Sequence, residues 1–135
     1  MAQSALSTLP RDAKGPLAPP PQLKGVMKIV ADAVGAWPDV VATAHWDLCD
    51  KSKVDGIDFY VGDAELGHIH LDQSIHLASN PMLGAELVRE GLGQPFPYIR
   101  GWTLAQVSDL GAEKSIAVFK RNYDRLKSSV RATHV

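Results

Sequence analysis

The feature that most constrains the fold of this chain is the alternation of polar and apolar residues between positions 64 and 77. Histidines at 68, 70 and 76 are interleaved there with isoleucines and leucines. This alternation is typical of half-buried β-strands, because successive side chains of a strand point to opposite faces. The apolar side chains must face a core. We therefore expect His68, His70 and His76 to stand together on the other face of a sheet.

The turns around these strands decide how they pair. Gly62 and Asp63 predict a tight hairpin with the preceding strand, since glycine adopts the positive φ of primed turns. A three-residue loop at 72–74 keeps the apolar residues on one face and places His70 opposite His76. The hairpin at Gly62 and Asp63 agrees with this pattern only if Gly67 carries a β-bulge, because an extra residue moves every later side chain to the other face of the strand. Without the bulge, some of the histidines would have to be buried and hydrogen-bonded. With it, the polar face holds Asp58, Tyr60, Glu65, His68, His70 and His76, and the core face holds Ile57, Phe59, Leu66, Ile69 and Leu71.

Helical periodicity flanks the strands on both sides. Apolar residues three and four positions apart predict a helix from Leu23 to Trp37 and a long one from about Gly111 to Val130. Asn80 followed by Pro81 predicts the N-cap and first residue of a further helix. Strands are expected at 40–46, 57–61, 64–71, 75–79, 96–99 and 102–107. This order predicts an α+β fold, an antiparallel sheet of about five to six strands with N-terminal and C-terminal helices packed on one face.

Composition sets the domain organisation and excludes some functions. Five of the nine prolines lie in residues 1–22, which predicts a Pro-rich flexible tail before a single α+β domain at 23–130 and a C-terminal tail at 131–135. A net charge of −1 argues against a nucleic-acid binder. No apolar run approaches the ~18 residues of a membrane span, so we expect a cytoplasmic protein that neither crosses membranes nor binds nucleic acid.

The histidine face suggests three kinds of chemistry. Imidazole is a common transition-metal ligand, which makes His68, His70 and His76 candidate metal ligands. Alternatively, His68 or His70 could act as a general base, oriented by Glu65 or Asp72. The third interpretation is a polar sheet surface whose histidines bind neighbouring carboxylates or backbone. The candidate ligand-binding residues are Glu65, His68, His70, His76, Tyr60 and Trp102.

These residues favour a binding module for a small molecule or a partner surface. A homodimer is one realisation, since an uncovered sheet face can pair with a second copy. The alternative is a metal-assisted or acid–base enzyme centred on His68, His70 and His76. Repulsion among three neighbouring imidazoles should also lower at least one pKa below the ~6.5 of free histidine, while nearby carboxylates oppose this effect.

The segment Glu65-Leu66-Gly67-His68-Ile69-His70 resembles the core motif of the bacterial and fungal "luciferase domain" family of unknown function. Supporting matches are Gly56-Ile57-Asp58-Phe59, Asp72, Ser74, His76-Leu77 and Gly101-Trp102. The resemblance spans about residues 25–128, and it implies a compact α+β domain, similar to YjbR-like proteins, with no established activity or cofactor. Two positions depart from the family pattern: residues 94–100 lack a histidine, and Gln73 replaces a common glycine.

Overall fold

The computed structural model describes residues 17–47, 49–50 and 52–133. Its helices are α2 (Gly25–Gly35), α3 (Pro81–Arg89) and α4 (Val107–Thr133). Its strands are β1 (Val40–Trp46), β2 (Val54–Val61), β3 (Ala64–His70), β4 (Ser74–Leu77), β5 (Gln94–Pro95) and β6 (Thr103–Gln106). None of the helices in this part of the chain has the length and apolar character needed to cross a membrane.

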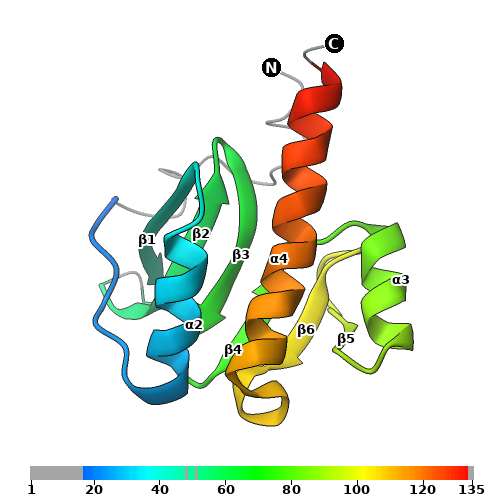
Figure 1. The fold of residues 1–135 in the computed structure, drawn as a ribbon. Coiled ribbons are helices and arrows are strands. Elements are labelled where there is room, and N and C mark those ends of the chain that lie inside the picture. Colours follow the sequence, from blue (N-terminus) through cyan, green and yellow to red (C-terminus); the bar gives the residue numbers. More distant parts are fainter. Residues whose placement is uncertain (1–16, 48, 51, 134–135) are drawn as a thin grey trace.

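The six strands form one antiparallel sheet in the order β1-β2-β3-β4-β6-β5. Helices α2 and α4 lie side by side on one face of the sheet, and α3 packs near the β5–β6 end (Figure 1). The predicted α+β fold, with its N-terminal and C-terminal helices on one face, is confirmed. The opposite face of the sheet is the one that carries the histidines.

The hydrophobic core fills the layer between the helices and the sheet. Its fully buried members come from β2, β3, β4 and the three helices, and they include Phe59, Leu66, Ile69, Ile75, Leu77, Val30, Val34, Leu87, Val118 and Phe119. Burial of such side chains, worth roughly 1.5–3 kcal/mol each, is the main force that holds the helices to the sheet. The fold is therefore anchored on the face that lacks histidines.

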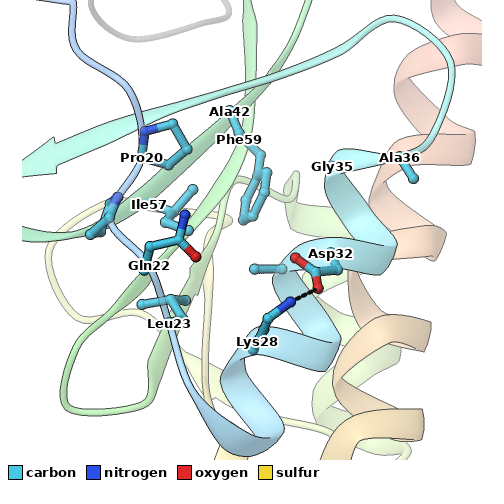
Figure 2. A pocket seen from close by; sticks show the side chains of 12 residues that line it. Pro20, Gln22, Leu23, Lys28, Asp32, Gly35, Ala36, Ala42, Ile57 and Phe59 are labelled. Atoms are coloured by element: carbon cyan, nitrogen blue, oxygen red, sulfur yellow. Dashed lines mark hydrogen bonds and ion pairs between the residues drawn. The ribbon is translucent and has the colours of Figure 1, made fainter.

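A pocket opens on this helical side, between the segment before α2, helix α2 itself, and strands β1 and β2 (Figure 2). Pro20 and Leu23 line it from the segment, and Ile57 and Phe59 line it from β2. The backbone N–H of Ala44 in β1 donates to the carbonyl of Ala18, at 3.0 Å, so this segment also touches the edge of the sheet.

The predicted β-bulge is present in β3. Phe59 pairs with Gly67 and Tyr60 pairs with Glu65, which leaves Leu66 as an extra residue on β3. Gly67 has a φ of 151°, and a Cβ there would lie 2.8 Å from the carbonyl oxygen of His76. Glycine is thus required by both conformation and space. The extra residue shifts the alternation of the side chains that follow it in β3, so that His68 faces away from the core.

The predicted register of the β3–β4 hairpin is wrong by two residues. Ile69 pairs with Ile75 and His68 pairs with His76, so the loop consists of residues 71–73. Asp72 fixes this loop, because its carboxylate accepts from the backbone N–H of Ser74 at 3.0 Å and from its hydroxyl at 2.7 Å. The displacement is even, so the histidines keep their face.

Two further expectations also need correction. Leu71 was expected in the core, but it lies in this loop and is 45% exposed. The strand expected at 96–99 is a series of bends, and the pairing residues are Gln94 and Pro95 of β5. Pro97 explains the difference, because it has no N–H to donate to a ladder.

The domain boundaries at 22 and 130 stay predictions. Residues 1–16 of the expected N-terminal tail and residues 134–135 lie outside the described part of the chain.

Candidate functional site

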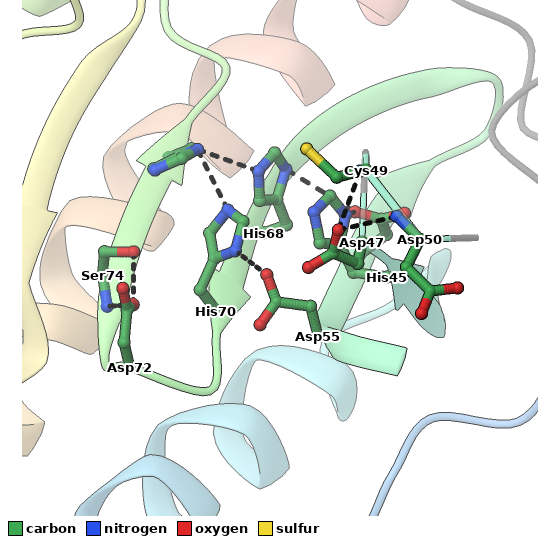
Figure 3. Close-up of polar contacts among 11 residues, drawn as sticks. His45, Asp47, Cys49, Asp50, Asp55, His68, His70, Asp72 and Ser74 are labelled. Atoms are coloured by element: carbon green, nitrogen blue, oxygen red, sulfur yellow. Dashed lines mark hydrogen bonds and ion pairs between the residues drawn. The ribbon is translucent and has the colours of Figure 1, made fainter. Parts of the chain in front are cut away.

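Three strands bring four histidines together on the sheet face opposite α2 and α4. His45 comes from β1, His68 and His70 from β3, and His76 from β4. His68 is central, because it pairs with Asp58 of β2 on one side and with His76 on the other. The rings of His45 and His68 stack with centroids 4.1 Å apart. Figure 3 shows the labelled members converging above the sheet.

Three of the histidines hold Nδ1 against a carboxylate oxygen at 2.7 Å: His45 on Asp58, His68 on Glu65 and His70 on Asp55. An ionised carboxylate only accepts hydrogen bonds, so each of these Nδ1 atoms carries the proton. The Nε2 atom of a neutral ring then keeps a free lone pair. Carboxylates that orient imidazoles in this way are typical of metal sites.

The Glu65–His68 contact depends on the bulge. In an unbroken strand, residues three apart point to opposite faces. The extra residue at Leu66 returns Glu65 and His68 to the same face, where they meet at 2.7 Å. Local backbone geometry therefore creates this carboxylate–imidazole pair.

The free nitrogens of the cluster converge on His76. Its Nδ1 lies 3.0 Å from Nε2 of His68 and 3.2 Å from Nε2 of His70. One nitrogen each of His45, His68 and His70 also fit within a 4.8 Å span. His76 Nδ1 has one proton, and the Nε2 atoms of His68 and His70 both face it as acceptors. A single hydrogen bond cannot fully satisfy the lone pairs of both Nε2 atoms.

A second group of potential ligands lies on the other side of His68. Asp58, Glu65 and His68 each place a ligand atom within 4.8 Å of the others. Asp58 and Glu65 already accept from protonated Nδ1 atoms. A cation there would have to displace two Nδ1 protons, whereas on the Nε2 side of His68 only the Nδ1 proton of His76 has to move. The Nε2 side of His68 is therefore the better metal position.

Burial favours the neutral form of two histidines of the cluster, His68 and His76. His45 and His68 are only 6% and 7% exposed, whereas His70 and His76 retain more contact with solvent. Burial lowers the pKa of His68, although Glu65 opposes the shift. Burial also lowers the pKa of His76, to about 3, with repulsion from His68 and His70 as the next causes. The direction agrees with the expectation from repulsion, but burial is the larger cause.

The remaining sequence-predicted residues border the cluster to different degrees. Tyr60 is buried on the histidine face and pairs with Glu65 in the sheet. The ring of Trp102 is buried, with its centroid 6.1 Å from that of His68. Trp102 therefore borders the cluster, and Tyr60 lies on the same face beside Glu65.

Sequence reasoning missed three residues that contact the cluster: His45, Asp55 and Phe96. A signal existed for His45, since residues 41, 43 and 45 of β1 alternate and so share one face of the strand. The observed register places Thr43 opposite Asp58, which puts this face on the histidine side of the sheet. Asp55 had no such signal, because it reaches His70 from the start of β2. Phe96 reaches the cluster from a loop, with its ring 4.6 Å from that of His76.

Comparison with known proteins agrees with the motif. The family model of the Luciferase domain matches residues 63–117. This match confirms the resemblance to the luciferase-domain family, and it includes the β3–β4 hairpin that carries His68, His70 and His76. No curated protein matches the chain. No solved structure matches it either, and the YjbR-like architecture stays a prediction.

Proposed function

We propose that this luciferase-like domain is a binding module whose ligand is a divalent transition-metal ion. His68 Nε2, His70 Nε2 and His76 Nδ1 would hold the ion, with His45 as a fourth imidazole beside them. One observation carries the proposal: Nδ1 of His76 lies 3.0 Å and 3.2 Å from the two Nε2 atoms, which share a single available proton. Once the proton of His76 moves to its own Nε2, a cation would satisfy the lone pairs of all three nitrogens.

The spacing of these nitrogens suits a metal. Metal–nitrogen bonds of about 2.0–2.1 Å in a tetrahedral site give nitrogen–nitrogen edges of about 3.3–3.4 Å. Two of the edges, at 3.0 and 3.2 Å, are close to that length. The ligand atoms of His68 and His70 lie within 4.8 Å of each other, in the group that they form with His45. An all-imidazole donor set favours zinc, copper, nickel or iron over magnesium and calcium, which prefer oxygen ligands.

The surroundings support the same conclusion. The carboxylates of Asp58, Glu65 and Asp55 orient His45, His68 and His70 through Nδ1, as outer partners do in metal centres. Burial lowers the pKa values of His68 and His76, which favours the neutral ligand form. Because the hydrophobic core lies on the other face, we expect a folded apo-protein that then binds the ion.

The exposure of His70 and His76 also supports a second candidate, a metal-assisted enzyme at the same site. A metal position that solvent can reach keeps room for a water molecule, whose pKa a bound zinc ion lowers to about 7. A screen for hydrolysis by the metal-loaded protein tests this candidate. Hydrolysis that the His70→Gln exchange leaves unchanged would rule it out.

Elemental analysis of the purified protein, with cobalt(II) reconstitution after chelation, tests the binding function. We expect about one metal ion per chain and cobalt d–d absorption bands typical of a low-coordinate nitrogen site. The His70→Gln exchange should remove a ligand and abolish both signals. His134→Gln is the matched control, because it exchanges the fifth histidine of the sequence, which is not among the proposed ligands.

Wild-type protein that binds none of zinc, nickel, copper or cobalt would refute the metal function. Equal metal content in the His70→Gln variant would refute the assignment of ligands. The homodimer stays a prediction, and light scattering on the metal-free and metal-loaded protein checks it.

A further inference from the structure

An aromatic wall stands beside the proposed metal position, made of Phe96, Tyr98 and Trp102. The ring of Phe96 lies 4.6 Å from that of His76, tilted by 47°. Tyr98 packs edge-to-face on Phe96 at 5.6 Å, and Trp102 lies 6.1 Å from Phe96. Trp102 is buried, Phe96 is half-buried and Tyr98 is 85% exposed, so the wall leads from the cluster into solvent.

Access to the cluster lies on the same side as this wall. His45 and His68 are buried, whereas His70 and His76 keep some exposure. A molecule that reaches a metal ion at the three nitrogens from solvent must therefore approach past His70 and His76. Phe96 is the ring that packs against His76 there, and its flanking residues, Pro95 and Pro97, restrict the backbone of the loop.

The charges at the site select against anions. Among the residues that the structure describes, the charged side chains that contact the histidines are acidic, namely Asp55, Asp58 and Glu65. Asp72 adds a further negative charge in the β3–β4 loop, next to the strand that carries His76. The three negative charges of the contacting carboxylates exceed the two positive charges of a divalent ion. The electrostatic field at the site would therefore repel a carboxylate or phosphate ligand and admit a neutral one.

We infer that the site takes a second, organic ligand: a small uncharged molecule with a planar aromatic ring and a nitrogen or oxygen donor. The donor would coordinate the metal ion, and the ring would stack on Phe96. This inference rests on the metal site proposed above and adds the class of molecule that this site binds. Offset or edge-to-face contacts are the preferred arrangement of two aromatic rings, and Phe96 is only half-buried where it lies beside His76.

Cobalt-loaded protein tests the inference with three probes at pH 8: imidazole, 4-phenylimidazole and benzoate. Titration of the cobalt absorption bands gives the affinity of each probe. We expect 4-phenylimidazole to bind about tenfold more tightly than imidazole, because only its second ring can stack on Phe96. Benzoate should bind more weakly than either, because it is an anion.

Phe96→Leu removes the aromatic face but keeps an apolar side chain, and it should reduce the preference for 4-phenylimidazole to less than about threefold. Met82→Ala, at an exposed position on α3, is the control and should keep the full preference. Unchanged cobalt bands in both variants before any probe is added would show that the metal site is intact.

The outcomes separate the two proposals. Cobalt bands absent from the wild-type protein would overturn the metal site, and this inference with it. Cobalt bands present with equal affinity for imidazole and 4-phenylimidazole would overturn the aromatic ligand alone. A preference that survives in Phe96→Leu, or benzoate bound as tightly as 4-phenylimidazole, would overturn it as well.

Discussion

Acidification should destabilise the metal-free protein through His76. In the folded protein, burial and the neighbouring imidazoles hold the pKa of His76 at about 3. In the unfolded chain it should return to about 6.5. Between these values the unfolded state binds the proton and the folded state does not. The contribution of His76 to stability is thus complete above about pH 6.5 and is lost progressively as the pH falls toward 3.

The two pKa values set the size of the effect. Linkage between about 6.5 in the unfolded state and about 3 in the folded state gives a loss of about 2 kcal/mol from pH 7 to pH 5. His76 is only partly buried, so solvent screening reduces this to about 1–2 kcal/mol. The pKa of His68 is also lowered, which adds a loss of the same sign.

Urea unfolding in the presence of a chelator, at pH 7, 6 and 5, measures this loss. His76→Asn is the comparison variant, because it removes the titrating ring and keeps a hydrogen-bonding amide. We expect the wild type to lose about 1–2 kcal/mol more than the variant over this range. Parallel losses in the two proteins would refute the lowered pKa. A wild type that gains stability at pH 5 would show that the carboxylates dominate the cluster.

Three further predictions concern the scaffold, and urea unfolding of each variant measures the change. Asn122→Leu should cost about 2–4 kcal/mol, because this buried amide donates to the backbone carbonyls of Leu66 in β3 and of Ala78 after β4, at 2.9 and 3.1 Å; a cost below about 0.5 kcal/mol would contradict this. Gly67→Ala should cost about 2–4 kcal/mol, since its Cβ would lie 2.8 Å from the carbonyl of His76, and full stability would show that the bulge can relax. Asn80→Ala removes the N-cap of α3 and should cost about 1 kcal/mol, whereas Asn80→Asp should restore most of it.

The face that carries the histidines could be predicted from the sequence because parity along a strand is a strict rule. Alternation placed His68, His70 and His76 together, and the mismatch between two hairpins pointed to a bulge at Gly67. The period of apolar residues likewise gave the two helices that cover the core. These conclusions needed only local patterns.

The rest of the site depended on contacts that local patterns do not contain. His45 joins the cluster through the register of β1 on β2, and the residues between these strands carry no hairpin signature that would fix it. The loop at 71–73 depends on one side chain, Asp72, that caps its own turn. Phe96 belongs to a bent segment with two flanking prolines, where neither strand nor helix periodicity applies.

The extra residue at Leu66 limits how this domain can change by insertion and deletion. Loss of that one residue would turn His68 and His70 toward α2 and α4 and would push Ile69 out into water. The β2–β3 hairpin can therefore tolerate a change of two residues within a strand far better than a change of one. Over evolution, such a length restriction would preserve the spacing from glutamate to the two histidines even where the residues around it diverge.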